Sequence, residues 1–226
     1  MCPEHAHFCK CSNWDYEKFD GIGKRSKVYA RSVALLADLK NSKIDRKKAL
    51  ANTRTTHVRL FSGLAKAGCE YFVGNFRGSQ KCLKEYEVVI NTANGVVSTT
   101  APSHVAAEMA ALSNEIEGDL TALADAGGPE ALETKDDLVN WLDVALERMV
   151  RFLSIHPYAN GNGHISRFMM FCYLSAVGVW PESWPLDDHP PYPYDEAIAA
   201  FRNNYPDGLR DFLLKYIVWE PKVSNS

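Results

Sequence analysis

The sequence predicts an all-α domain with one β-hairpin. Apolar residues recur every three or four positions along most of the chain, which is typical of helices that bury one face. Residues 87–100 differ, because two β-branched runs flank an Asn-Gly pair there, the pattern of a hairpin. The length of 226 residues suits one domain. We divide the chain into an N-terminal extension, 1–25, and a helical domain, 26–220.

The sequence signal differs in strength between the expected helices. The strongest begins at Thr134, which can cap it, and ends at His156-Pro157, because proline disfavours helical geometry in the residue before it. Its broad apolar stripe marks a central helix. The other expected helices cover residues 26–39, 54–67, 103–124, 163–177, 195–203 and 207–218, and residues 71–78 are expected to be extended.

Composition excludes several classes of function. A net charge of −3 without a basic run argues against a nucleic-acid partner. The longest apolar stretch, 168–180, is too short to span a bilayer, and residues 1–21 lack an apolar leader. Cys69, Cys82 and Cys172 are scattered singly, as reduced thiols would be. We therefore expect a cytoplasmic protein that does not bind membranes.

The segment HPYANGNGHISR, residues 156–167, joins two predicted helices and concentrates reactive groups. His156 stands where the first helix breaks, and an imidazole suits a general base near neutral pH. Gly161-Asn162-Gly163 opens the second helix, where exposed amides bind anions. Arg167 follows one turn later and offers a fork suited to phosphate. Each feature alone is usually structural, but their combination indicates phosphoryl-type transfer.

This segment resembles the signature of the Fic/Doc family, H-P-F-x-[D/E]-G-N-G-R-x-x-R. The matching positions are His156, Pro157, Gly161, Asn162, Gly163 and Arg167, and Tyr158 replaces the phenylalanine. The piece 76–78 resembles the segment before the family's flap, and residues 87–100 resemble the flap itself. The resemblance covers residues 54–218. It implies the all-α Fic core with a β-hairpin flap.

The resemblance also implies a reaction, the transfer of AMP from ATP to a Ser, Thr or Tyr hydroxyl of a target protein. His156 would be the catalytic base. The amides of residues 161–163 and the Asn162 side chain would hold phosphate oxygens, and Arg167 would hold the outer phosphates. The target would dock along the flap, 87–100, as an added strand.

Two positions depart from the signature. Asn160 stands where the family places an acidic ligand of Mg²⁺ (or Mn²⁺), and an amide oxygen can bind the metal but lacks the charge. His164 stands at a nucleotide-binding arginine, and a neutral imidazole cannot make the bidentate fork. Two alternatives to AMP transfer therefore stay open. The first is a Fic transferase with another donor, such as UMP, phosphate or phosphocholine. The second is a degenerate module that binds nucleotide or protein without catalysis.

Two further patterns concern regulation and metal. Residues 113–118 fit the family's inhibitory pattern, [S/T]-x-x-x-E-[G/N], but they lie between the flap and the signature, so we interpret the match as chance. Either a separate inhibitory partner or no such inhibition is compatible with the sequence. The N-terminus holds thiol and imidazole groups suited to a structural Zn²⁺ that takes no part in catalysis: Cys2, His5, His7, Cys9 and Cys11.

Overall fold

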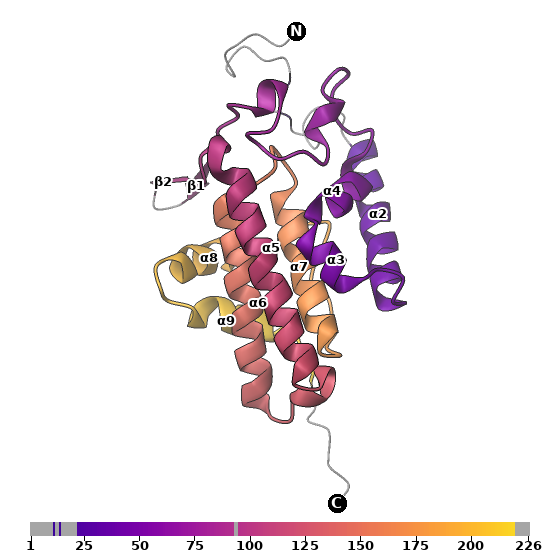
Figure 1. The fold of residues 1–226 in the computed structure, drawn as a ribbon, viewed down its shortest axis with the longest axis vertical. Helices are drawn as coiled ribbons and strands as arrows, with labels where there is room; N and C mark the ends of the chain where they lie inside the picture. The colour runs from indigo at the N-terminus through magenta and orange to yellow at the C-terminus, as the bar shows by residue number, and fades with distance from the viewer. Residues whose placement is uncertain (1–10, 12–13, 15–21, 93–94, 220–226) are drawn as a thin grey trace, which may run out of the picture.

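The computed structural model describes residues 11, 14, 22–92 and 95–219 (Figure 1). Within these residues the protein has eight α-helices and one two-stranded antiparallel sheet, which confirms the predicted fold class. The helices are α2 (Ile22–Lys40), α3 (Arg46–Ala51), α4 (Thr53–Phe61), α5 (Pro102–Asp125), α6 (Lys135–Ile155), α7 (Asn162–Ala176), α8 (Tyr194–Arg202) and α9 (Asp207–Leu214).

Three long helices, α5, α6 and α7, form the centre of the molecule and run along its long axis (Figure 1). Helices α2 to α4 flank them on one side, and α8 and α9 pack against α6 on the other. The most enclosed helix is α7, which is buried without a break from His164 to Leu174. A helix that is buried on all sides has neighbours on all sides, so α7 lies at the centre of the bundle.

The start and end of α6 agree with the sequence. The Thr134 hydroxyl accepts a hydrogen bond from the Asp137 amide at 3.2 Å, and the Thr134 amide donates to the Asp137 carboxylate at 2.8 Å. This reciprocal capping box satisfies two amides that have no partner inside the helix. The helix ends at Ile155, directly before His156-Pro157, as predicted.

The region between residues 40 and 86 departs from the prediction. Helix α3 was not expected, and α4 ends at Phe61 although the apolar pattern continues to residue 67. The pattern continues because Leu64 is also buried, but its carbonyl accepts from the side chains of Trp14 and Lys24. The expected extended piece, 71–78, begins inside a 3₁₀ turn, Glu70–Phe72. After Phe61, hydrogen bonds from side chains that are distant in sequence thus hold the backbone in place of the helical hydrogen bonds that the local apolar pattern predicts.

The hairpin is confirmed. Strand β1 (Val89–Thr92) pairs with β2 (Gly95–Ser98), with Val89 opposite Ser98 and Thr92 opposite Gly95. Asn94 of the expected Asn-Gly turn lies outside the described residues. The hairpin stands beside the same end of the bundle as the loop between α6 and α7 (Figure 1).

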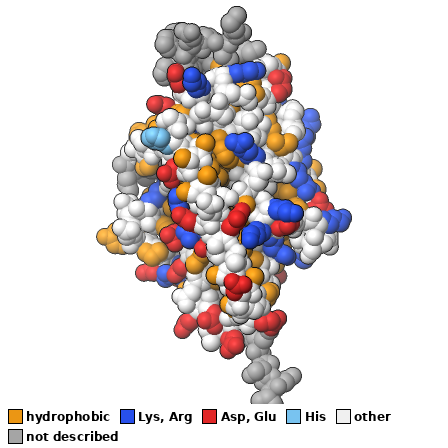
Figure 2. All heavy atoms as spheres, viewed as in Figure 1, with side chains coloured by type: hydrophobic (Ala, Val, Ile, Leu, Met, Phe, Trp, Pro, Cys, Tyr) orange, Lys and Arg blue, Asp and Glu red, His pale blue; other side chains and the backbone are white. Residues whose placement is uncertain are grey.

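The charges are unevenly distributed over the surface. On the face shown in Figure 2, Lys and Arg side chains gather over α2 to α4. Asp and Glu side chains gather at the bottom of the view, where α5 ends and α6 begins. No helix in the described ranges is both long and apolar enough to cross a membrane.

A disulfide corrects the prediction of reduced cysteines. The sulfur of Cys69 is bonded to that of Cys11, with the two Cα atoms 5.7 Å apart, and Cys82 is also disulfide-bonded. Cys172 is free and buried, as expected. The scattered positions of the cysteines led to the wrong prediction because the fold brings together two cysteines that are 58 positions apart. Cysteine usage therefore no longer supports a cytoplasmic location.

A substitution at Gly78 tests the close contact between the backbone before the flap and the start of α5. Its φ is 83°, and a Cβ there would overlap the Pro102 carbonyl at the start of α5. We expect Gly78→Ala to lower the free energy of unfolding by about 2–4 kcal/mol, from backbone strain plus overpacking. Urea denaturation measures this change.

Gly118 is the matched control, because it lies inside α5 and a Cβ there would meet nothing within 4 Å. Gly118→Ala should stabilise the protein by about 0.5–1 kcal/mol, since alanine has the higher helix propensity. Equal effects of the two substitutions would contradict the role of Gly78.

Candidate active site

His156 lies at the point where α6 ends. Its φ of 52° is left-handed, and its amide donates to the Phe152 carbonyl at 2.9 Å. Pro157 follows and cannot continue the helix. Non-glycine residues are uncommon in this conformation and occur disproportionately at functional sites. The reversal at His156 makes its side chain part of a cavity wall rather than of the apolar face of α6.

Asn162 closes the loop between α6 and α7. Its Oδ1 accepts from the Tyr158 amide at 3.0 Å, and its Nδ2 donates to the Tyr158 carbonyl at 2.8 Å. The side chain is 2% exposed. Asn162 therefore shapes the loop through its Oδ1 and one N–H of its Nδ2. Its Nδ2 has a second N–H, and the expectation that the side chain also holds a phosphate oxygen stays a prediction.

Gly161 allows α7 to start close to its neighbours. Its φ is 84°, and a Cβ there would lie 2.5 Å from the Phe61 ring. No side chain caps α7 at this end. Amides in the first turn of a helix have no partner inside the helix and carry its positive dipole end, so the start of α7 suits an anion.

Arg167 and His164 lie on the first turns of α7 and are almost fully buried, 3% and 7% exposed. The guanidinium of Arg167 donates to the Leu186 carbonyl at 3.1 Å. Its Nη1 would lie 2.9 Å from a Cβ at Gly163, so glycine makes room for it. The Nε2 of His164 donates to the Asp187 carbonyl at 3.2 Å.

One cavity of about 330 Å³ brings these groups together. The signature residues that line it are His156, Asn160, Gly161, Asn162, Gly163, His164 and Arg167. The other lining residues are Arg25, Ala159, Asp187, Asp188 and His189. The residues selected from the sequence therefore share one concave site, the arrangement expected of a small-molecule site.

Burial keeps His156 in the form that a base requires. Burial lowers its pKa to about 4; a hydrogen bond to Leu153 acts in the opposite sense, and the charges of Arg77 and Arg202 lower the pKa further. The imidazole is therefore neutral at pH 7. Its Nδ1 lies 3.4 Å from the Leu153 carbonyl, which can only accept, so Nδ1 carries the proton and Nε2 carries the lone pair.

His164 is also neutral. Burial, and then the charge of Arg167, lower its pKa to about 3. At pH 7 the residue in the place of the signature's arginine therefore contributes a hydrogen-bonding ring without charge. Arg167 is the buried cation of the cavity.

Comparison with known families agrees with this geometry. A family model described as Fic/DOC family matches residues 50–174, more than half of the chain. The chain belongs to the Fic/DOC family. No curated protein matches the sequence.

Two solved Fic structures are similar to the chain. The first is the N-terminal Fic domain of a cell filamentation protein from Bartonella quintana, described as a VirB-translocated Bep effector protein. It shares 18% sequence identity, with a TM-score of 0.57 over 86% of this chain and 80% of that one. The second is a Fic domain containing signaling protein from Bacteroides thetaiotaomicron, with 18% identity and a TM-score of 0.49 over 84% of this chain and 67% of that one. The Bartonella structure supports the Fic fold.

Asn160 does not fit the role of metal ligand that its place in the Fic signature implies. Its Oδ1 accepts from the Gly161 amide at 2.6 Å, and its Nδ2 donates to the Trp14 carbonyl at 2.9 Å. Mg²⁺ strongly favours carboxylates, and this amide is neutral and already engaged by the backbone. Among the described residues, no group of three or more His, Cys, Asp or Glu could hold a metal. We therefore assign no step to a metal.

The N-terminal zinc cluster is corrected at one position. Cys11 is in a disulfide with Cys69, so it has no thiolate to offer a zinc ion. Cys2, His5, His7 and Cys9 lie outside the described residues. Sequence proximity alone suggested the cluster, and it could not reveal a partner 58 positions away.

The internal inhibitory pattern lies away from the site. Ser113 donates from its hydroxyl to the Ala51 carbonyl at 3.2 Å, and Glu117 is exposed on α5. Neither residue lines the cavity around Arg167. This agrees with the interpretation of the pattern as a chance match.

Sequence reasoning missed Arg77, which is 1% exposed. Its guanidinium donates to the carbonyls of Ile155, His156, Tyr86 and Thr100 and to the Thr99 hydroxyl, at 2.8–3.0 Å. It therefore joins the end of α6 to both ends of the flap. A buried arginine flanked by Phe76 and Gly78 gives no periodic signal in one sequence.

His57 was missed for the same reason. It is fully buried on α4, stacked on Tyr158 with ring centroids 4.0 Å apart. Its Nδ1 accepts from the Gly74 amide at 3.0 Å, so Nε2 carries the proton and donates to the Asn160 carbonyl at 3.0 Å. The Tyr158 hydroxyl hydrogen-bonds that of Thr53 at 2.8 Å, which gives this buried tyrosine a polar partner where the signature has phenylalanine.

The pH dependence of stability tests His57. Burial lowers its pKa to about 4, against 6.5 in an unfolded chain. The unfolded state therefore binds the extra proton between these values, and stability present above pH 6.5 is lost as the pH falls towards 4. We expect this single group to contribute about 3 kcal/mol to the loss.

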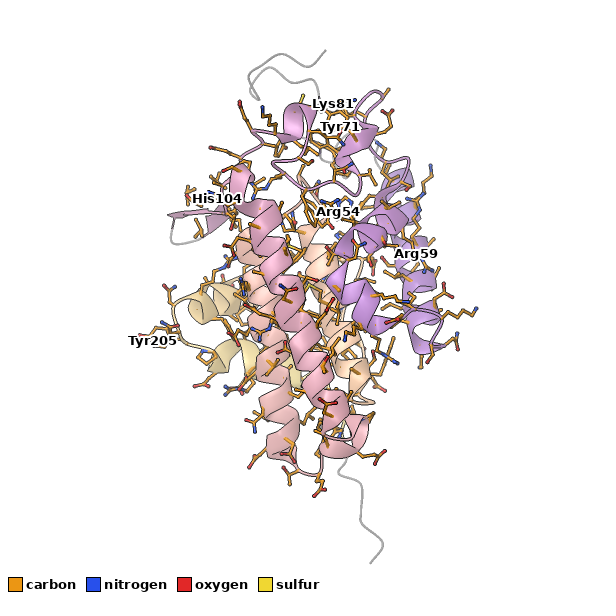
Figure 3. All side chains as sticks on the ribbon, viewed as in Figure 1. Arg54, Arg59, Tyr71, Lys81, His104 and Tyr205 are labelled. Carbon is orange, nitrogen blue, oxygen red and sulfur yellow. A yellow bond between two sulfur atoms is a disulfide. The ribbon has the colours of Figure 1, made fainter. Side chains whose placement is uncertain are left out.

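Urea denaturation at pH 7 and pH 4.5 measures the effect, and His57→Gln should make the pH dependence shallower. His104, exposed at the start of α5, supplies the control His104→Gln, which should leave it unchanged (Figure 3). An unaltered pH dependence in His57→Gln would contradict the assignment.

Arg77→Lys tests the link between α6 and the flap. A lysine cannot supply all five hydrogen bonds, so buried carbonyls lose their donor, and we expect a loss of about 2–4 kcal/mol. Transfer activity should also fall at temperatures where the variant is folded. The control is Arg210→Lys, which weakens the hydrogen bonds from Arg210 to Asp143 outside the cavity. It should lower stability alone, and equal activity in the two variants would refute a role for Arg77 in the site.

Proposed function

We propose that this protein transfers AMP from ATP to a hydroxyl group of another protein. One observation carries the proposal: a neutral imidazole, an uncapped helix start and a buried guanidinium line the same cavity. Fic domains generally transfer nucleotide or phosphate groups to proteins, commonly with Mg²⁺. The choice of AMP and ATP rests on the match of the signature residues.

In this proposal each group in the cavity has a separate role in the reaction. The Nε2 of His156 takes the proton of the target hydroxyl as its oxygen attacks the α-phosphorus. The new oxygen–phosphorus bond forms while the bond to the leaving pyrophosphate breaks. The first-turn amides of α7 stabilise the negative charge on the α-phosphate oxygens, and Arg167 holds the outer phosphates.

Arg25 supplies a second guanidinium for the outer phosphates. It extends from α2 to the cavity wall, where it faces the same space as Arg167. Because His164 is uncharged at pH 7, Arg25 provides a positive charge that the signature position lacks. Its place on a separate helix explains why the signature did not reveal it.

The hairpin offers a docking edge for the target. Val89 and Val96 are 55% and 66% exposed, so the hairpin presents apolar side chains to solvent. An extended peptide can add a strand to such an edge through main-chain hydrogen bonds. We propose this edge, within residues 87–100, as the place where the target segment lies. A separate inhibitory partner and a cytoplasmic location stay predictions.

The rival function is a Fic module that binds nucleotide or protein without catalysis. The neutral His164 and the engaged side chain of Asn160 favour it, because both remove charge that the signature provides. A donor other than ATP, such as one carrying UMP, phosphate or phosphocholine, is the rival within the enzyme class. Intact-mass spectrometry after incubation with each donor separates these possibilities by the mass added to the protein or a target.

His156→Ala tests catalysis directly. We expect transfer to fall by about 10²–10⁴-fold, the usual contribution of a general base, with nucleotide affinity nearly unchanged. In the wild-type protein, kcat/KM should be flat near pH 7 and fall only as the pH approaches 4, where His156 becomes protonated. Undiminished transfer by the variant would exclude His156 as the base.

Arg167→Ala tests the nucleotide. Loss of a charge-assisted contact should weaken ATP binding by about 1.5–3 kcal/mol, while AMP, which lacks the outer phosphates, should bind almost as before. Calorimetry with both ligands measures the difference without knowledge of the target. Equal losses for ATP and AMP would place Arg167 at the α-phosphate or in the fold alone.

A further inference from the structure

Asn160 connects two parts of the molecule that are far apart in sequence. Its side chain donates to the Trp14 carbonyl and accepts from the Gly161 amide, and its own carbonyl accepts from His57. All three contacts lie at 2.6–3.0 Å. Every polar group of this side chain is thus used to hold the backbone directly before α7.

Trp14 is a firm attachment point for Asn160. Its side chain is 3% exposed, and its indole N–H donates to the Leu64 carbonyl at 3.3 Å. The ring packs edge-on against Phe61 and Phe72, with centroids 6.2 and 5.9 Å away. Phe61 is the residue that a Cβ on Gly161 would meet, so Trp14 also supports the wall against which Gly161 packs.

The Cys11–Cys69 disulfide fastens this attachment covalently. Cys11 lies three residues before Trp14, and Cys69 directly precedes the 3₁₀ turn that holds Phe72. The Tyr71 hydroxyl donates to the Cys11 sulfur at 3.4 Å. The bond therefore keeps Trp14 close to the aromatic residues on which it packs, because it limits how far the chain can move from Cys69.

We propose that Asn160 is a positioning residue: through Trp14, and with the Cys11–Cys69 disulfide, it holds Gly161 and the start of α7 in the geometry that binds phosphate. This proposal rests on the proposed function for its ligand. It gives the asparagine a role that aspartate cannot fill, because a carboxylate would set a negative oxygen against the Trp14 carbonyl and has no proton to donate. The departure from the family signature is then a change of role, from metal ligand to link.

The proposal makes the phosphate site sensitive to oxidation state. With the disulfide reduced, the part of the chain that the structure describes holds Trp14 by its packing and by its hydrogen bonds to Leu64 and Asn160, without a covalent tie through Cys11. The Trp14 carbonyl is then a less fixed acceptor for Asn160. The amides at the start of α7 would then sample other orientations. Small misplacements of groups that bind a reacting phosphate have large effects on rate and affinity.

Asn160→Asp is the first test. Hydrogen–deuterium exchange of the peptide that covers residues 158–165, which needs no nucleotide, should quicken about tenfold as the loop loses its link. The dissociation constant for ATP, measured by calorimetry with and without Mg²⁺, should rise about tenfold. The matched control is Asn203→Asp, which removes the same kind of contact, an amide donor to the Ala199 carbonyl, at the exposed end of α8. It should change neither readout.

The disulfide is tested by the double variant Cys11→Ser with Cys69→Ser, in buffer without reductant. Exchange in residues 158–165 should quicken and ATP should bind more weakly, in the same direction as in Asn160→Asp. Cys172→Ser, which keeps the disulfide and changes the buried free thiol, should behave as wild type in both readouts. Combining Asn160→Asp with the double variant should add little, because both act through one link.

The outcomes separate the two proposals. Tighter ATP binding by Asn160→Asp in the presence of Mg²⁺ would overturn the positioning role and restore that of a metal ligand. Unchanged exchange in residues 158–165 in both the asparagine and the cysteine variants would also overturn it. Failure of the wild-type protein to bind ATP, with faster exchange in the variants, would refute the proposed nucleotide and leave the link supported.

Discussion

The arrangement of the site depends on the hydrogen bonds that the buried guanidinium of Arg77 donates. Helix α6 must stop at His156-Pro157, and the carbonyls of Ile155 and His156 there lack partners within the helix. Arg77 satisfies both and also binds the two ends of the flap. Burying a charge is unfavourable unless hydrogen bonds offset the lost water, and here every nitrogen of the group donates. Burial lowers its pKa to about 10, so the group stays charged at neutral pH.

Burial also determines what the histidines near the cavity can do. His57, His156 and His164 come from different elements, yet desolvation is the largest cause of the lowered pKa in each. A neutral imidazole can donate from one nitrogen and accept at the other. His57 uses both nitrogens to hold backbone groups, whereas in His156 Nδ1 binds the Leu153 carbonyl and Nε2 keeps its lone pair. The same burial thus produces one structural residue and one candidate base.

The positive charge of the cavity is spread over elements distant in sequence. Arg167 belongs to the signature, while Arg25 comes from α2. Asp187 and Asp188 face the same cavity and counter part of this charge. Such a distribution suits a ligand that carries several charges along its length, with its most anionic part near the guanidinium groups and one phosphate at the start of α7. In the proposed function, Arg25 thus offsets the missing charge at position 164.

The sequence by itself determined the central helices, the hairpin and the group of residues 156–167, because these depend on local periodicity, on proline and glycine geometry, and on a short signature. It did not predict α3 or the end of α4 at Phe61. It correctly placed His156 at the end of a helix and Arg167 one turn into the next. Only the tertiary structure decided what the side chains bind. Asn160 was assigned to a metal, yet its side chain binds backbone groups, and Cys11 pairs with Cys69 rather than with a metal. Asn162 was assigned to phosphate, and the structure adds a role in holding the backbone of the loop. Arg77 and His57 were missed because their partners lie on other elements, and a hydrogen bond between distant residues leaves no periodic trace in a single sequence.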